Sequence, residues 1–76
     1  MTVENVRDVV RELCEIEFEF PRHLMEPLFH MANRMMHRAI DTNQLYQIEV
    51  LLDALAYMGA RNVTAEKKHA ELAGQA

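Results

Sequence analysis

The chain has 76 residues, a net charge of −4 and one cysteine. A chain this short forms one small domain, and a single cysteine excludes an internal disulfide as support for it. The negative charge disfavours general binding to the phosphate backbone of nucleic acids. Half of the residues are apolar and six are methionine, so we expect a second subunit or another protein to cover part of the apolar surface.

The sequence shows no targeting or membrane signal. Residues 1–10 have no basic start followed by an apolar run, which a secretory signal peptide requires. The densest apolar run, residues 50–58, is interrupted by Asp53 and is far shorter than the roughly 18 residues of a membrane span. We therefore expect a cytoplasmic protein that has no membrane partner.

Apolar residues at steps of three and four predict a first helix that begins after Thr2, a residue suited to capping a helix N-terminus. These residues are Val3, Val6, Val10 and Leu13. The next stretch, Cys14 to Phe20, alternates apolar and acidic residues, which is typical of a strand. A helix that continues to Phe20 leaves Phe18 outside its apolar face. Two interpretations stay open: a helix over 3–14 followed by an extended segment, or a helix over 3–20.

A second helix is predicted over 22–40. Its apolar residues cover about half of the helix circumference, which is wide enough to contact two neighbours. Pro27 lacks a backbone N–H and is best tolerated in the first turn of a helix. We therefore expect the regular part of this helix to begin near Glu26.

Two more helices are predicted from their end signals. Residues Asp41 to Gln44 have the composition and spacing of a capping box, so we expect the third helix over 42–58. Gly59 is expected to end it. A weaker fourth helix is expected over 65–73, with Thr64 as its N-cap. The fold class is therefore all-α, with three main helices, a weak fourth and one short segment that is extended or helical.

The third helix is apolar on two sides, and the second side contains Tyr46, Val50 and Tyr57. Tyrosine suits interfaces because it buries a large area and keeps a polar tip. In so small a domain we expect this second side to meet another chain, and the edge of the chain's own core is the alternative. We predict a homodimer or a higher even oligomer.

Three histidines at steps of seven share one face of the second helix with Arg34. They are His23, His30 and His37. Imidazoles bind metals and respond to pH, but seven residues span about 10 Å of helix. Two such side chains cannot share one zinc ion. We expect a solvated polar face, with two alternatives: a surface that pairs with the acidic N-terminal segment, and a pH- or metal-responsive oligomer.

An alternating strand, a proline and two helices, from Cys14 to about Met58, resemble the ribbon–helix–helix DNA-binding fold. The resemblance implies a dimer in which two strands pair into a ribbon that enters the major groove. This sequence departs from that pattern because its second helix is longer and contains Pro27, and because another helix precedes the ribbon. The outward face of the ribbon would also be acidic, with Glu15, Glu17 and Glu19. We therefore expect the paired dimer, and keep a DNA-binding regulator only as an alternative.

No catalytic motif is present in the sequence. Cys14 has no nearby histidine to activate it, and the only glycines, Gly59 and Gly74, cannot form a phosphate-binding loop. We expect no enzymatic activity and no cofactor. We predict a regulatory module that binds and inhibits another protein, as an inhibitor, antirepressor or adaptor does. The predicted contact residues are Glu15, Glu17, Phe18, Glu19, Tyr46, Val50 and Tyr57, with His23, His30, Arg34 and His37 as a charge-pairing stripe.

Overall fold

The structure is a computed structural model that describes residues 2–16 and 22–75. It contains four helices in these described residues: α1 (Val3–Ile16), α2 (Arg22–Asp41), α3 (Leu45–Tyr57) and α4 (Val63–Gly74). The described residues form no strand, so the expectation of an all-α fold is confirmed. The molecule is elongated, with principal extents of 40 × 18 × 18 Å.

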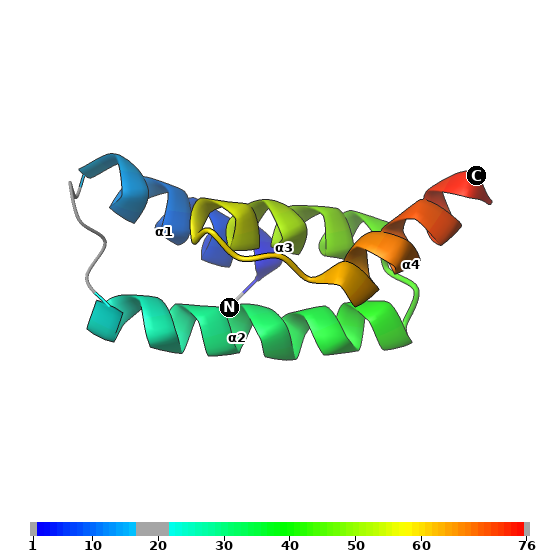
Figure 1. The fold of residues 1–76 in the computed structure, drawn as a ribbon, viewed down its shortest axis with the longest axis horizontal. Helices are drawn as coiled ribbons and strands as arrows, with labels where there is room; N and C mark the ends of the chain where they lie inside the picture. The colour runs from blue at the N-terminus through cyan, green and yellow to red at the C-terminus, as the bar shows by residue number, and fades with distance from the viewer. Residues whose placement is uncertain (1, 17–21, 76) are drawn as a thin grey trace.

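The helix α3 lies at the centre of the arrangement. It runs beside α1 in the same direction, and α2 runs antiparallel to both (Figure 1). The pair formed by α1 and α3 makes the most extensive contact, and α2 packs mainly on α3. The last helix, α4, packs on α3 and less on α2, and it projects beyond the body at one end (Figure 1).

The core lies where the first three helices meet. Its buried apolar residues are Val3, Val6, Val10, Ala32, Met36, Ala39, Ile48, Val50, Leu51, Ala54, Leu55 and Ala65. Burying one valine, leucine or isoleucine side chain completely contributes about 1.5–3 kcal/mol, so this cluster is the main source of stability. On the main apolar side of α3, Leu51 and Leu55 are buried. On its second side, Val50 is buried in the chain's own core, whereas Tyr46 and Tyr57 are exposed.

Two predicted helix ends are confirmed. The backbone N–H of Asn5 donates to Oγ1 of Thr2 at 3.1 Å, so Thr2 caps the start of α1. At the end of α3, Gly59 has a φ of +72°, a left-handed conformation that glycine adopts without strain. The N–H of Ala60 then donates to the carbonyl oxygen of Leu55 at 2.9 Å, which is the closing bond of a Schellman motif.

The strand predicted from Cys14 is wrong for residues 14–16, because α1 continues to Ile16. The buried side of α1 extends from Val10 to the half-buried Cys14 at a helical step of four. Packing against the core therefore outweighs the alternating pattern. The ribbon that the resemblance implies does not begin at Cys14, and residues 17–20 lie outside the described residues.

The capping box predicted at Asp41 to Gln44 is also wrong. Asp41 is the last residue of α2, and Asn43 adopts a φ of +55°. The N–H of Gln44 donates to the carbonyl oxygen of Ala39 at 2.9 Å, so these residues end α2 instead of starting α3. Asparagine tolerates the left-handed conformation better than most residues. Gln44 precedes α3 without a side-chain capping bond.

The start predicted for the fourth helix is two residues too late. Asn62 is the N-cap, and its Oδ1 accepts a hydrogen bond from the N–H of Ala65 at 3.0 Å. Thr64 therefore lies inside the first turn of α4. Asparagine and threonine are both good N-cap residues, so the sequence offered two candidates two positions apart.

The start predicted for the regular part of the second helix is wrong as well. The helix begins at Arg22, and Pro27 lies inside it instead of in its first turn. Proline has no N–H, so the carbonyl oxygen of His23 loses the donor that an ordinary residue would supply. The helix is continuous through Pro27, and its first residues extend past the end of α3 (Figure 1).

Candidate interaction site

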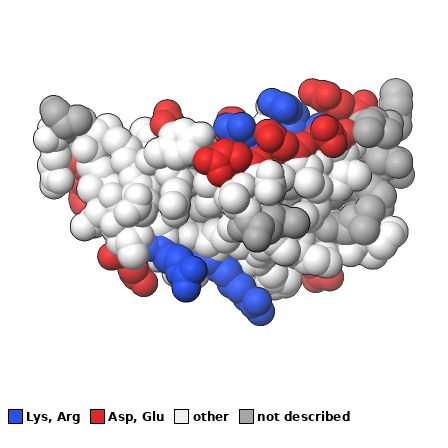
Figure 2. Space-filling model, turned by 180° about the vertical axis from the view of Figure 1, so that it is seen from behind, with Lys and Arg blue, Asp and Glu red and all other residues white. Residues whose placement is uncertain are grey.

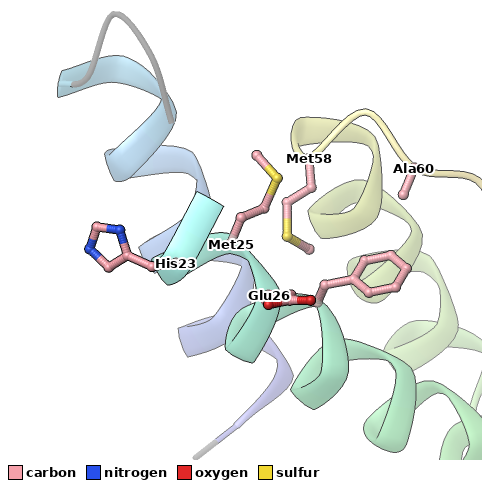
Figure 3. Close-up of a pocket in the computed structure, with 6 residues that line it drawn as sticks. His23, Met25, Glu26, Met58 and Ala60 are labelled. Atoms are coloured by element: carbon pink, nitrogen blue, oxygen red, sulfur yellow. The ribbon is translucent and has the colours of Figure 1, made fainter. Parts of the chain in front are cut away.

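A large hollow lies where the start of α2 faces the end of α3. It has a volume of about 690 Å³ and is lined by His23, Met25, Glu26, Phe29, Met58 and Ala60. We call it the methionine hollow. Met25 and Met58 point toward one another across it, whereas His23 is turned away (Figure 3). Methionine side chains are flexible and polarizable, so this lining can adapt its shape to an apolar group.

The methionine hollow exists because the described helices leave one side of the first half of α2 uncovered. The turn at Gly59 sends the chain back from the end of α3, which places Met58 and Ala60 on the wall of the hollow. The next helix, α4, lies toward the other end of α2 (Figure 1). Met25 and Phe29 consequently remain half-exposed.

Two of the predicted contact residues lie at this same end of the molecule. Sγ of Cys14 donates to the carbonyl oxygen of Tyr57 at 3.3 Å and links the ends of α1 and α3. Glu15, the next residue in α1, is exposed. Tyr57 is 42% exposed and adjoins Met58. The structure therefore brings Glu15 and Tyr57 to the end that carries the methionine hollow.

The other predicted contact residues are not brought together there. Tyr46 is 58% exposed, but it lies eleven residues before Tyr57, about 16 Å away along α3. Val50, between the two tyrosines, is only 4% exposed and belongs to the core. The predicted tyrosine–valine stripe is thus not a continuous surface. Residues 17–19, which include Glu17, Phe18 and Glu19, lie outside the described residues.

A second, smaller hollow surrounds Tyr46, and we call it the Tyr46 hollow. Its volume is about 330 Å³, and it is lined by Thr2, Val3, Glu4, Met35, Arg38, Tyr46 and Gln47. Glu4 and Arg38 reach this hollow from α1 and α2. Within the described residues, no ion pair joins these two side chains.

Charge is distributed unevenly over the helices. The described helices α1 and α3 carry six carboxylates and two arginines, a net charge of −4, whereas α2 carries three arginines and two carboxylates. In Figure 2, acidic side chains gather along one edge with two basic side chains among them. The two basic side chains on the opposite edge have acidic ones to either side, and the surface between the edges is largely uncharged. The described ion pairs are local, from Arg7 and Arg11 to Asp8 and from Arg61 to Glu66.

The histidine stripe lies on the outer face of α2. His23, His30, Arg34 and His37 are all exposed there. No described ion pair links this stripe to α1. The described residues also contain no group of three histidine, cysteine, aspartate or glutamate side chains that could hold a metal ion.

Comparison with known protein families, with curated proteins and with solved structures found no match. The site is therefore interpreted from its own geometry. Sequence reasoning missed Met25, Phe29 and Met58 as neighbours. The abundance of methionine on a wide apolar face signalled an adaptable surface, but the position of Met58 depends on how α3 packs. In residues 2–16 and 22–75, no helix is long and apolar enough to span a membrane.

Proposed function

We propose that this chain is a non-enzymatic module that binds another protein at the end carrying the methionine hollow, and regulates that protein by occupying its surface. The occupant we propose is an amphipathic segment that inserts an apolar side chain between Met25 and Met58. Basic residues on the same segment contact the carboxylates at this end. An inhibitor, antirepressor or adaptor acts in this way.

The observation that carries the proposal is the apolar lining of the methionine hollow. Met25 and Phe29 on α2 stand opposite Met58 and Ala60 at the end of α3. An apolar helix face that enters a groove is a common mode of protein recognition, and methionine-rich grooves accommodate partners of different shape. The volume of about 690 Å³ is enough for one or two large side chains.

Charge supports a basic partner. Glu26 lines the methionine hollow, and Glu12 and Glu15 are exposed in the last turns of α1. Among the arginines whose side chains the structure describes, Arg11 is held by Asp8 at 3.5 Å and Arg61 by Glu66 at 3.1 Å. Complementary charges raise the rate of association and select among partners.

The proposal is tested by capture followed by titration. The tagged protein is used to retain partners from a lysate of its source organism, and the retained proteins are identified by mass spectrometry. We expect one stoichiometric partner, whose binding is then measured by calorimetry. Met25→Ala and Met58→Ala should each weaken this binding on the order of tenfold, since truncation of a central apolar contact typically costs more than 1 kcal/mol.

Matched control variants, with the same substitutions outside the methionine hollow, show whether a loss of binding is specific to the hollow. Met31→Ala truncates a methionine on another side of α2 and should leave the affinity unchanged. Glu26→Lys should slow association and reduce its salt dependence, whereas Glu71→Lys, on the exposed side of α4, should not. The proposal is wrong if no partner other than the chain itself is retained, or if Met31→Ala and Met58→Ala affect binding equally.

A further inference from the structure

We propose that a second copy of this chain docks on the Tyr46 hollow to form a two-fold symmetric dimer. In such a dimer both copies use the same surface, so the surface must be complementary to itself. The Tyr46 hollow has that property because it carries one carboxylate, Glu4, and one guanidinium, Arg38, around a largely exposed tyrosine.

Charge complementarity specifies how the two copies meet. Glu4 and Arg38 line the same hollow, yet no ion pair joins them within the chain. A two-fold axis through the hollow places Glu4 of each copy beside the partner's Arg38 and forms two reciprocal pairs.

The middle of this surface is apolar. Tyr46 is 58% exposed, and Met35 beside it is half-buried. Tyrosine and methionine are both enriched at protein interfaces.

This dimer goes beyond the proposed function and is independent of it. The Tyr46 hollow uses Met35 and Arg38, in the second half of α2, whereas the methionine hollow uses the first half. The two proposals can therefore fail separately. If the chain dimerises but captures no other protein, the proposed function is wrong and the dimer stands. If it captures a partner as a monomer, the dimer is wrong and the proposed function stands.

The test is the mass of the full chain in solution by sedimentation equilibrium across the micromolar range. We expect twice the chain mass of 8.9 kDa. Glu4→Arg and Arg38→Glu should each raise the dissociation constant on the order of tenfold or more, because each places like charges opposite one another. An equimolar mixture of the two variants should restore the dimer, since the charge reversed in one chain then faces the opposite charge in the other.

Controls carry the same charge changes outside the hollow. Glu12→Arg on α1 and Lys67→Glu on α4 are at exposed positions and should leave the dimer intact. Circular dichroism shows whether each variant is folded. If a charge reversal unfolds the chain, Tyr46→Ala decides, because truncating an exposed side chain spares the core and should still weaken the dimer on the order of tenfold. A monomeric wild type, or a dimer that Tyr46→Ala and both charge reversals leave unchanged, overturns the proposal.

Discussion

The two halves of α2 have the same kind of apolar residue and very different surroundings. In the second half, Ala32, Met36 and Ala39 are buried against α3 and its neighbours. In the first half, residues 22–31, none of the described side chains is buried, and Met25 faces an open hollow. The two halves differ because neighbouring helices bury the apolar residues of the second half and leave those of the first half partly exposed.

This contrast shows how a short chain divides its apolar residues between stability and binding. The three helices α1, α2 and α3 meet over the second half of α2, and there the apolar face becomes core. Toward the start of α2, the ends of α1 and α3 leave one side of the helix uncovered, and there the same type of face becomes a surface. A wide apolar stripe in a sequence therefore does not reveal which part of it is core.

The largest expected effect compares one methionine from each half. Met36 is 1% exposed, so Met36→Ala should destabilise the chain by about 2–5 kcal/mol, through lost burial and the cavity left behind. Met25→Ala removes a half-exposed side chain and should cost less than about 1 kcal/mol. Urea denaturation measures both. Equal losses would mean that the two halves do not differ in packing.

The predicted loss of stability in Met36→Ala is large for so small a domain. A chain of 76 residues is typically stable by about 4–11 kcal/mol, so Met36→Ala should remove a large share of the free energy of unfolding and clearly lower the urea midpoint. Met35→Ala is a useful intermediate, because Met35 is partly buried like Met25 but packs against the core. Its loss of stability should fall between the other two.

The second prediction asks whether proline weakens the first half of α2. Pro27 is exposed and leaves the carbonyl oxygen of His23 without a helical donor. Pro27→Ala should stabilise the chain by about 1–2 kcal/mol, because the gain in helix propensity is partly offset by a more flexible unfolded chain. Hydrogen exchange should slow most over residues 22–31. A loss of stability would show instead that the proline ring contributes to packing.

The third prediction concerns how the second half of α2 ends. Asn43 adopts a positive φ, so Asn43→Ala should cost about 1 kcal/mol, whereas Asn43→Gly should be neutral or stabilising. Asp41→Ala should change the free energy of unfolding by less than about 0.5 kcal/mol, since Asp41 does not cap α3. Were Asp41→Ala the more damaging change, the capping box expected from the sequence would be correct after all.

Local signals in the sequence predicted the fold class and several helix ends. Thr2 and Gly59 act through bonds to residues a few positions away, so the sequence contains what is needed to place them. Residues 41–44 fit both a capping box that starts α3 and a left-handed turn that ends α2. Which of the two forms depends on how far α2 packs against the core. Cys14 is similar, because its alternating neighbours favoured a strand while the core favoured a helix.

The candidate site was less predictable because it depends on contacts between distant residues. Tyr57 and Glu15 were expected at an interface, and both lie exposed at one end. Their neighbour Met58 was expected only as part of an apolar stripe, and its position opposite Met25 follows from the antiparallel packing of α2 and α3 (Figure 3). Val50 was misplaced for the same reason, since only the assembled helices show that it is buried.

The smallest expected effect is on the outer face of α2, where the two halves should be alike. His23 in the first half and His37 in the second are both exposed, so His23→Ala and His37→Ala should each change stability by less than about 0.5 kcal/mol. Zinc should not shift the urea midpoint, because steps of seven residues separate the imidazoles by about 10 Å. A midpoint raised by zinc, and lost in either variant, would instead support the metal-responsive alternative. If both histidine variants change stability equally little, the two halves of α2 do not differ on their outer face. The difference between them then lies on the side of α2 that faces α3, which is buried in the second half and open in the first.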